Sequence, residues 1–264
     1  MTEEQKISVE VWSARASLNE PGELERCCRN WLGPGEWERA LRFRQASSRN
    51  QHVVGRGMAR RLLTQATLEE PAKIVLDWSD HGKPFIVSPR ELIKPFNVTH
   101  TEGMVLVGIG NRGLIGIDVE RLSRTPDIGL ARRFFAAPEV DYVMGKSDPD
   151  ARRAAFLRVW TLKESFIKAI GTGLSMPLAD FAFERIDEPN PSVRMLRPGL
   201  APATNWSFLT FSPADGYLAA IAIGEPGMPV EDAVPRPAGP HEWVLNRFEN
   251  LLAADRSPIA PPST

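Results

Sequence analysis

The sequence predicts a mixed protein of the α/β (α+β) class. Residues 7–12 alternate apolar and polar side chains, which is typical of a strand with one buried face. Residues 20–66 read as helical. A long helix predicted from about Asp150 to Ile170 is followed by further β-rich runs. Helices therefore stand beside short strands in both parts of the chain, and no internal sequence repeat is evident.

Composition narrows the class of protein. The chain has 264 residues, of which 42% are hydrophobic and 25% charged, enough for one large domain or two modest ones. The net charge of −1 gives no general electrostatic reason to expect nucleic-acid binding. Cys27 and Cys28 are adjacent, and neighbouring cysteines rarely form a good disulfide, so we expect reduced thiols.

The N-terminal segment and the hydropathy of the chain bear on location. Residues 1–12 are polar and then alternating, without the apolar core of a signal peptide. No run approaches the roughly 18 apolar residues of a membrane span. We therefore expect a soluble, cytoplasmic protein with no membrane partner.

The first part of the chain combines an arginine-rich helix with several short strands. Apolar residues recur near helical spacing over residues 49–66. A turn is expected at residues 80–83, where Gly82 precedes Lys-Pro. Strands are expected at Ile74–Trp78, Phe96–Thr99, Met104–Ile109 and Leu114–Glu120. The last two are predicted to form a hairpin, because Asn111-Arg112-Gly113 supplies turn chemistry between them.

The second part begins with helices and continues with strands. Helices are expected at 128–135 and 138–144, and the long helix should stop at Gly171. Strands are expected at Phe181–Ile186, Trp206–Phe211 and Tyr217–Ile223. Residues 225–264 are interpreted as a Pro-rich tail with a short amphipathic helix at 242–252 and a frayed end.

A pair of carboxylates ends the predicted strand at 114–120. Strand side chains alternate, so Asp118 and Glu120 point the same way. Adjacent carboxylates repel each other unless a cation intervenes, and hard oxygen ligands suit Mg²⁺. The plainer interpretation is a solvated strand end, because this short pattern is common.

The long helix carries Trp160, Glu164 and Lys168 at intervals of four, so that the three side chains share one face. An ordinary surface ion pair would explain Glu164 and Lys168. It would not explain a tryptophan one turn earlier, which indicates that this face is covered.

Groups suited to phosphate precede the acidic strand. Lys83 lies on the predicted tight turn, Thr99 ends a predicted strand, and His100 follows it directly. A cation, a hydroxyl and an imidazole can bind phosphate through charge and hydrogen bonds. A structural histidine is the alternative for His100.

The order of these motifs is more specific than any one of them. It resembles the 4′-phosphopantetheinyl transferases of the surfactin-synthetase-activating type over about residues 39–223. The motifs are Gly82-Lys83-Pro84, Phe96-Asn97-Val98-Thr99-His100, Gly116-Ile117-Asp118-Val119-Glu120 and Trp160-Thr161-Leu162-Lys163-Glu164-Ser165-Phe166-Ile167-Lys168. Arg133-Phe134-Phe135 and residues 171–178 are also similar to that family.

The resemblance implies a fold of two similar halves in a pseudo-twofold arrangement, with coenzyme A between them. Residues 1–113 would form the coenzyme A-binding half. Residues 114–224 would form the half that carries the metal and catalytic residues. The chain would act as a monomer, since one chain supplies both sides of the cleft.

Site residues follow from the resemblance position by position. Asp118, Glu120 and Glu164 would hold Mg²⁺, with Mn²⁺ as the alternative metal, and Lys168 would contact the pyrophosphate. The coenzyme would be lined by Lys83, Thr99 and His100. The family usually has serine where this chain has Thr99, so the hydroxyl is kept. Basic residues of the first half would meet the adenosine 3′-phosphate; the candidates are Arg39, Arg44 and His52, with Arg56 in reserve.

The implied reaction moves the 4′-phosphopantetheine arm of coenzyme A to a serine of an acyl or peptidyl carrier protein, releasing adenosine 3′,5′-bisphosphate. Glu164 would act as the base, directly or through a metal-bound water. An acidic carrier could be steered by Arg121, Arg124, Arg132 and Arg133. One alternative is a Mg²⁺-dependent phosphoester hydrolase. Another is a degenerate coenzyme A or carrier-protein binder, against which the retained carboxylates and Lys168 argue.

Overall fold

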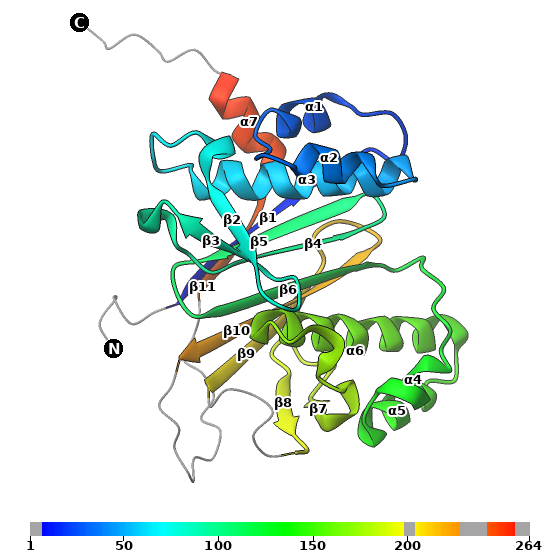
Figure 1. The fold of residues 1–264 in the computed structure, drawn as a ribbon. Helices are drawn as coiled ribbons and strands as arrows, with labels where there is room; N and C mark the ends of the chain where they lie inside the picture. The colour runs from blue at the N-terminus through cyan, green and yellow to red at the C-terminus, as the bar shows by residue number, and fades with distance from the viewer. Residues whose placement is uncertain (1–6, 198–203, 227–241, 257–264) are drawn as a thin grey trace, which may run out of the picture.

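Two sheets lie face to face between outer layers of helices, so that the layers run helix, sheet, sheet, helix (Figure 1). The computed structural model describes residues 7–197, 204–226 and 242–256. Within these residues, the mixed helix and strand content confirms the predicted fold class.

The first sheet has the order β11-β1-β5-β4. Its strands are β1 (Ser8–Ala14), β4 (Phe96–Thr101), β5 (Met104–Gly110) and β11 (Glu242–Arg247). The central pairs β1–β5 and β5–β4 are antiparallel, whereas β11 runs parallel to β1. The alternation in residues 7–12 therefore correctly predicted β1, whose Val9 and Val11 are buried.

Helices cover the outer face of the first sheet. They are α1 (Glu23–Arg29), α2 (Glu36–Leu41) and α3 (Ala46–Leu63), with the β2 (Val75–Trp78) and β3 (Pro84–Ser88) hairpin at one side (Figure 1). Val54 and Met58 of α3 are fully buried against Val105 and Val107 of β5. Two short 3₁₀ turns, Pro71–Lys73 and Arg90–Leu92, connect these elements.

The second sheet has the order β6-β10-β9 and is antiparallel throughout. Its strands are β6 (Leu114–Arg121), β9 (Thr204–Phe211) and β10 (Tyr217–Pro226). The outer face is covered by α6 (Pro149–Ile170), beside α4 (Leu130–Phe134), α5 (Ala137–Met144) and the β7 (Phe181–Glu184) and β8 (Ser192–Met195) hairpin. Helix α6 ends as predicted, because Gly171 takes a φ of +84°. None of the described helices is both long and apolar enough to cross a bilayer.

The inner faces of the sheets share a third apolar core. Val9, Val11 and Leu106 of the first sheet pack with Ile117 and Ile221 of the second. Strands β5 and β6 are therefore buried on both faces along most of their length, which explains why each reads as a nearly continuous apolar run. The division after Gly113 into two domains stays a prediction.

The hairpin predicted from residues 104–109 and 114–120 is wrong. Strand β5 pairs with β1 and β4, whereas β6 pairs with β10. Residues 111–113 instead carry the chain from one sheet to the other. Gly113 has a φ of +87°, as the turn signal suggested, but the turn joins two layers instead of two paired strands.

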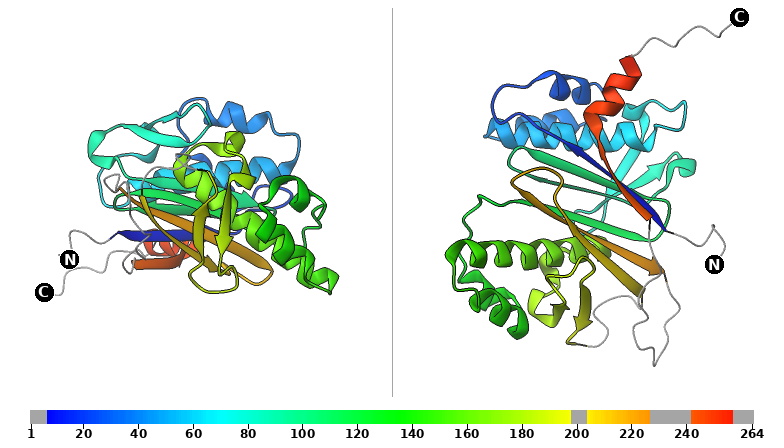
Figure 2. Two further views of the ribbon diagram at one scale, coloured as in Figure 1. Left: turned by 90° about the horizontal axis from the view of Figure 1, so that it is seen from below. Right: turned by 180° about the vertical axis from the view of Figure 1, so that it is seen from behind.

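The helix predicted over 242–252 needs a similar correction. Residues 242–247 form β11, and α7 (Phe248–Arg256) starts only afterwards. In the rear view β11 runs along β1 at the margin of the first sheet (Figure 2). Phe248 is fully buried in the core of the first half. Most of the predicted Pro-rich linker, residues 227–241, lies outside the described residues.

Replacing Gly116 by alanine is expected to destabilise the protein by about 1–3 kcal/mol or more. A Cβ there would lie 2.0 Å from Ser165 O and 2.3 Å from Ala169 N, so α6 would have to move away from β6. Urea unfolding measures the change. Gly108→Ala is the matched control, because its Cβ would meet its nearest neighbour at an ordinary 3.6 Å. Equal stability of the two variants would contradict the close helix–strand contact.

A candidate active site where the two halves meet

The candidate site is built on the free edge of β6. Asp118 and Glu120 alternate with Ile117 and Val119, whose side chains enter the core between the sheets. The two carboxylates share the opposite face and are only 5% and 8% exposed. Burial of two acidic side chains in succession requires compensating charge or hydrogen bonds.

Three elements converge on Asp118. Lys168 Nζ of α6 lies 2.5 Å from Asp118 Oδ1, and the Thr99 hydroxyl of β4 donates to the same oxygen at 3.1 Å. Lys168 Nζ also donates to Thr99 Oγ1 at 3.2 Å. The structure thus joins residues from both halves in one network.

Glu120 forms an ion pair with Arg124. Burial, reinforced by the neighbouring Asp118 charge, nevertheless raises the pKa of Glu120 to about 7. The Arg124 guanidinium also lies 6.0 Å from the centre of the Trp160 ring. Trp160 stacks on Phe156, so this face of α6 is covered, as its tryptophan suggested.

Glu164 is half-buried on α6, one turn before Lys168. Burial raises the pKa of its carboxyl, Asp118 raises it further, and Lys168 opposes the shift. Glu164 lines a cleft of about 230 Å³ together with Lys168 of α6 and Asn97 of β4. The β2–β3 turn at His81–Pro84 and the loop after α6 close its sides.

His100 follows Thr99 on β4. Displacement of water by surrounding protein lowers its pKa, and nearby Lys168 lowers it further, although part of the ring surface is exposed. His52 of α3 lies within electrostatic reach of His100, whose charge contributes to lowering the pKa of His52. Burial lowers the pKa of His52 to about 4, with Arg56 and Arg39 adding to the effect.

The basic residues proposed to meet the adenosine 3′-phosphate do not all lie close together. Arg39, His52 and Arg56 influence one another electrostatically. His52 Nε2 is buried without a hydrogen-bond partner in the described structure, and its ring packs against Phe43. Arg44 is exposed on the segment between α2 and α3.

Lys83 is placed differently from the expectation of a free cation beside the coenzyme. Its Nζ donates to Ala169 O at 2.7 Å and to Ile115 O at 3.2 Å. Burial lowers its pKa to about 8. The ammonium therefore already holds two backbone acceptors of the second half.

A hard divalent cation needs several oxygen donors close together. Across the described residues, no three His, Cys, Asp or Glu side chains are arranged as a ready metal site. Lys168 and Arg124 lie against the carboxylates instead. Asp118 Oδ2, however, is buried without any hydrogen-bond partner, and burial together with the Asp118 charge raises the pKa of Glu120. A cation would relieve both, so the residues fit Mg²⁺ once the side-chain cations move aside.

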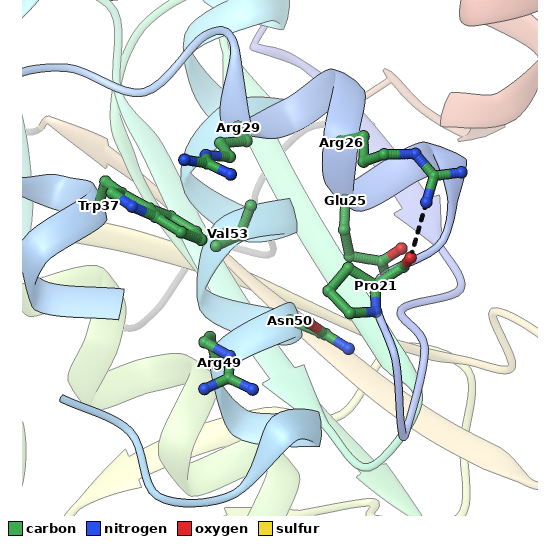
Figure 3. Close-up of a pocket in the computed structure, with 8 residues that line it drawn as sticks. All are labelled: Pro21, Glu25, Arg26, Arg29, Trp37, Arg49, Asn50 and Val53. Carbon is green, nitrogen blue, oxygen red and sulfur yellow. Dashed lines mark hydrogen bonds between the residues drawn. The ribbon is translucent and has the colours of Figure 1, made fainter. Parts of the chain in front are cut away.

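A second hollow of about 290 Å³ lies among α1, α2 and α3 (Figure 3). Arg26, Arg29 and Arg49 surround it, and Arg29 lies over the Trp37 ring at 3.9 Å. None of the predicted site residues lines it.

The four arginines considered for steering an acidic partner have separate environments. Arg121 pairs with Glu102 at 2.8 Å, and Arg124 pairs with Glu120. Arg132 and Arg133 are exposed on α4. Arg132 and Arg133 therefore present both charges outward, whereas Arg121 and Arg124 are engaged by carboxylates.

Two residues within the motifs have roles that sequence reasoning missed. Asn97 Oδ1 accepts the Ile117 N–H at 3.1 Å across the junction of the halves. Lys163 points away from the cleft and is fully buried with Glu139, 2.8 Å away. Their positions inside the motifs were visible in the sequence, but the direction of their side chains was not.

Comparisons with known proteins place the sequence in a family. Residues 114–222 match the model of the 4′-phosphopantetheinyl transferase superfamily. The 4′-phosphopantetheinyl transferase HetI of Nostoc sp. is 32% identical over 222 residues, covering 82% of this chain and 89% of that protein. The 4′-phosphopantetheinyl transferase Sfp of Bacillus subtilis is 26% identical over 200 residues, covering 76% and 85%. Among solved structures, Thermotoga maritima holo-[acyl-carrier-protein] synthase aligns with a TM-score of 0.36 and 24% identity, over 42% of this chain and 62% of that one.

Proposed function

The chain belongs to the 4′-phosphopantetheinyl transferase superfamily, and on this premise we propose that it transfers the 4′-phosphopantetheine group of coenzyme A to a serine hydroxyl of an apo acyl or peptidyl carrier protein. The observation that carries the proposal is the convergence of Thr99, Asp118 and Lys168 beside Glu164. A hydroxyl, carboxylates and an ammonium gathered in one place suit the transfer of a charged phosphoryl group.

Asp118, Glu120 and Glu164 would hold Mg²⁺, or Mn²⁺ in its place. The unpartnered Asp118 Oδ2 and the raised pKa of Glu120 support this assignment. When bound, the metal supplies positive charge to the pyrophosphate of coenzyme A.

The protein's own side chains handle the proton and the phosphoryl charge. The carrier serine oxygen forms a bond to the β-phosphorus of coenzyme A, and the bond from that phosphorus to the bridging oxygen breaks. The bridging oxygen leaves with adenosine 3′,5′-bisphosphate. Glu164 accepts the serine proton, directly or through water, and burial raises the pKa of its carboxyl, which strengthens it as a base. Lys168 and His100 bind phosphoryl oxygens, where charge increases.

The adenosine end of coenzyme A would lie against α2 and α3. Arg39 and Arg44 would meet its 3′-phosphate, and His52 would donate a hydrogen bond in its neutral form. The low pKa of His52 supports this neutral form at physiological pH. Arg56 would add positive charge near this phosphate. Its guanidinium carbon lies 5.3 Å from the centre of the Trp78 ring.

The carrier would approach the metal side of the cleft. Exposed Arg132 and Arg133 on α4 would attract acidic side chains around its serine. A single chain would suffice, because the cleft takes residues from both halves of the same molecule. The reaction would occur in the cytoplasm.

Replacing Lys168 by methionine is expected to have opposite effects on metal binding and on turnover. Lys168 occupies Asp118 Oδ1, so its removal should tighten Mg²⁺ binding in the absence of coenzyme A. Loss of its charge from the pyrophosphate should lower turnover by about 10²–10³-fold. Isothermal titration calorimetry and a carrier-modification assay measure the two quantities. Lys168→Arg keeps the charge and serves as the control. Weaker metal binding together with normal turnover would contradict the idea that Lys168 and Mg²⁺ compete for Asp118.

The proposed function is separated from its alternatives by omitting the carrier. Coenzyme A and Mg²⁺ are incubated with the protein, with and without apo carrier, and adenosine 3′,5′-bisphosphate is quantified. We expect release only with the carrier. Release without carrier would indicate a hydrolase, and absence of release in both cases would indicate a binding module.

A further inference from the structure

Strand β6 lies at the edge of its three-stranded sheet and pairs only with β10. Its other edge faces β4 of the first sheet, but no backbone ladder joins the two strands. The N–H and C=O groups along such an edge need partners when protein covers them. These groups belong to the residues that immediately precede and include Asp118.

Two side chains of the first half supply those partners. Asn97 Oδ1 accepts the Ile117 N–H at 3.1 Å, and Asn97 is itself only 4% exposed. Lys83 Nζ donates to Ile115 O at 3.2 Å. The next contact along β6 is the hydrogen bond from Thr99 to Asp118 in the candidate site. The same line of contacts thus runs from the junction of the halves into the cleft.

Lys83 also holds the end of α6. Its second acceptor, Ala169 O at 2.7 Å, is one of the last four carbonyls of that helix, which have no partner within the helix. A cation at a helix C-terminus is favourable because the carbonyl dipoles point towards it. One ammonium therefore connects the β2–β3 turn, β6 and α6.

We propose that Asn97 and Lys83 are positioning residues that lock β6 and α6 against β4 and so keep Asp118, Lys168 and Thr99 in their relative places. The proposal rests on the proposed transferase function. It assigns the Lys83 ammonium to the protein backbone and not to the phosphates of coenzyme A. Burial of the ammonium, which lowers its pKa to about 8, is consistent with an internal role.

Positioning makes a kinetic prediction that differs from ligand binding. Misplacement of reacting groups by about 1 Å can cost about 10²-fold in rate. Lys83→Met and Asn97→Leu should therefore lower kcat by about 10²-fold and change the KM for coenzyme A by less than about threefold. Lys83→Arg, which retains donors and charge, should recover most of the rate.

The experiment combines steady-state kinetics with amide exchange followed by NMR on the full chain. In Asn97→Leu, the Ile117 amide should exchange about fivefold faster or more, because its acceptor is gone. Lys94→Met, on the exposed segment before β4, is the control and should leave both readouts unchanged.

Several outcomes would overturn the proposal. A raised KM with unchanged kcat in Lys83→Met would make Lys83 a coenzyme ligand. If the Ile117 amide exchanged at the wild-type rate in Asn97→Leu, the proposed Asn97 contact would be refuted, whether or not the wild-type protein modifies a carrier. If Lys83→Met does not fold, the other two variants decide. The proposal would be overturned if Asn97→Leu kept the wild-type kcat or if Lys83→Arg did not retain most of it. Absence of transfer by the wild-type protein would refute the proposed function, and with it the positioning role, while the exchange result still reports on the contact.

Discussion

Replacing Glu164 by glutamine is expected to lower carrier modification by about 10²–10⁴-fold. Glutamine keeps the size of the side chain but cannot accept the serine proton at neutral pH. Glu164 is half-buried within electrostatic reach of Lys168 and Asp118, and burial raises the pKa of its carboxyl, which makes it a stronger base. The same substitution removes one negative charge from the set proposed to hold Mg²⁺, so metal affinity should fall as well.

Initial rates with saturating coenzyme A measure this effect. Asp150→Asn changes an exposed carboxylate on the same helix and provides the control, which should retain wild-type turnover. Wild-type turnover of Glu164→Gln would reject both roles given to Glu164. A fall in rate that excess Mg²⁺ fully restores would leave only the role in metal binding.

Replacing Lys163 by methionine is expected to destabilise the protein by about 3–5 kcal/mol. Lys163 and Glu139 are both 0% exposed, and removing one partner leaves the other charge buried and uncompensated. Lys163 Nζ also donates to Leu178 O and Phe181 O, while Glu139 accepts from Ala136 N and Phe183 N. The pair therefore ties α5, α6 and β7 together.

A second substitution tests that explanation. Glu139→Gln in the Lys163→Met background removes the unpaired charge and keeps an acceptor for one backbone N–H. This double variant should recover part of the lost stability, as measured by the free energy of unfolding in urea. A double variant less stable than Lys163→Met alone would show that the buried charge is not the main cost.

The sequence predicted most of the local structure but not all of the long-range pairing. Periodicity identified β1 and α6, because each buries one regular face. The predicted pairing of residues 104–109 with 114–120 was wrong, since turn chemistry at Gly113 is the same whether two strands pair or pass into different sheets. Periodicity failed at 242–247 because β11 becomes a strand only by pairing with β1, more than two hundred positions earlier.

The sequence indicated which residues belong to one candidate site, but not which of their atoms are in contact. Motif order placed Asp118 and Lys168 in one predicted site with separate roles, and their direct contact at 2.5 Å was not foreseen. Lys163 and Glu164 are neighbours in sequence but lie about 100° apart around the helix. One therefore enters the core and the other the cleft. Which of the two side chains enters the core, and which backbone groups Lys83 binds, depend on packing between the halves. Local sequence patterns do not encode that packing.

The proposed transfer is tested most directly by the intact mass of an apo carrier protein after incubation with this protein, coenzyme A and Mg²⁺. We predict a gain equal to one 4′-phosphopantetheine group, lost when the carrier serine is replaced by alanine and strongly slowed by Glu164→Gln. An unchanged carrier mass across acyl and peptidyl carrier proteins would contradict the proposed function.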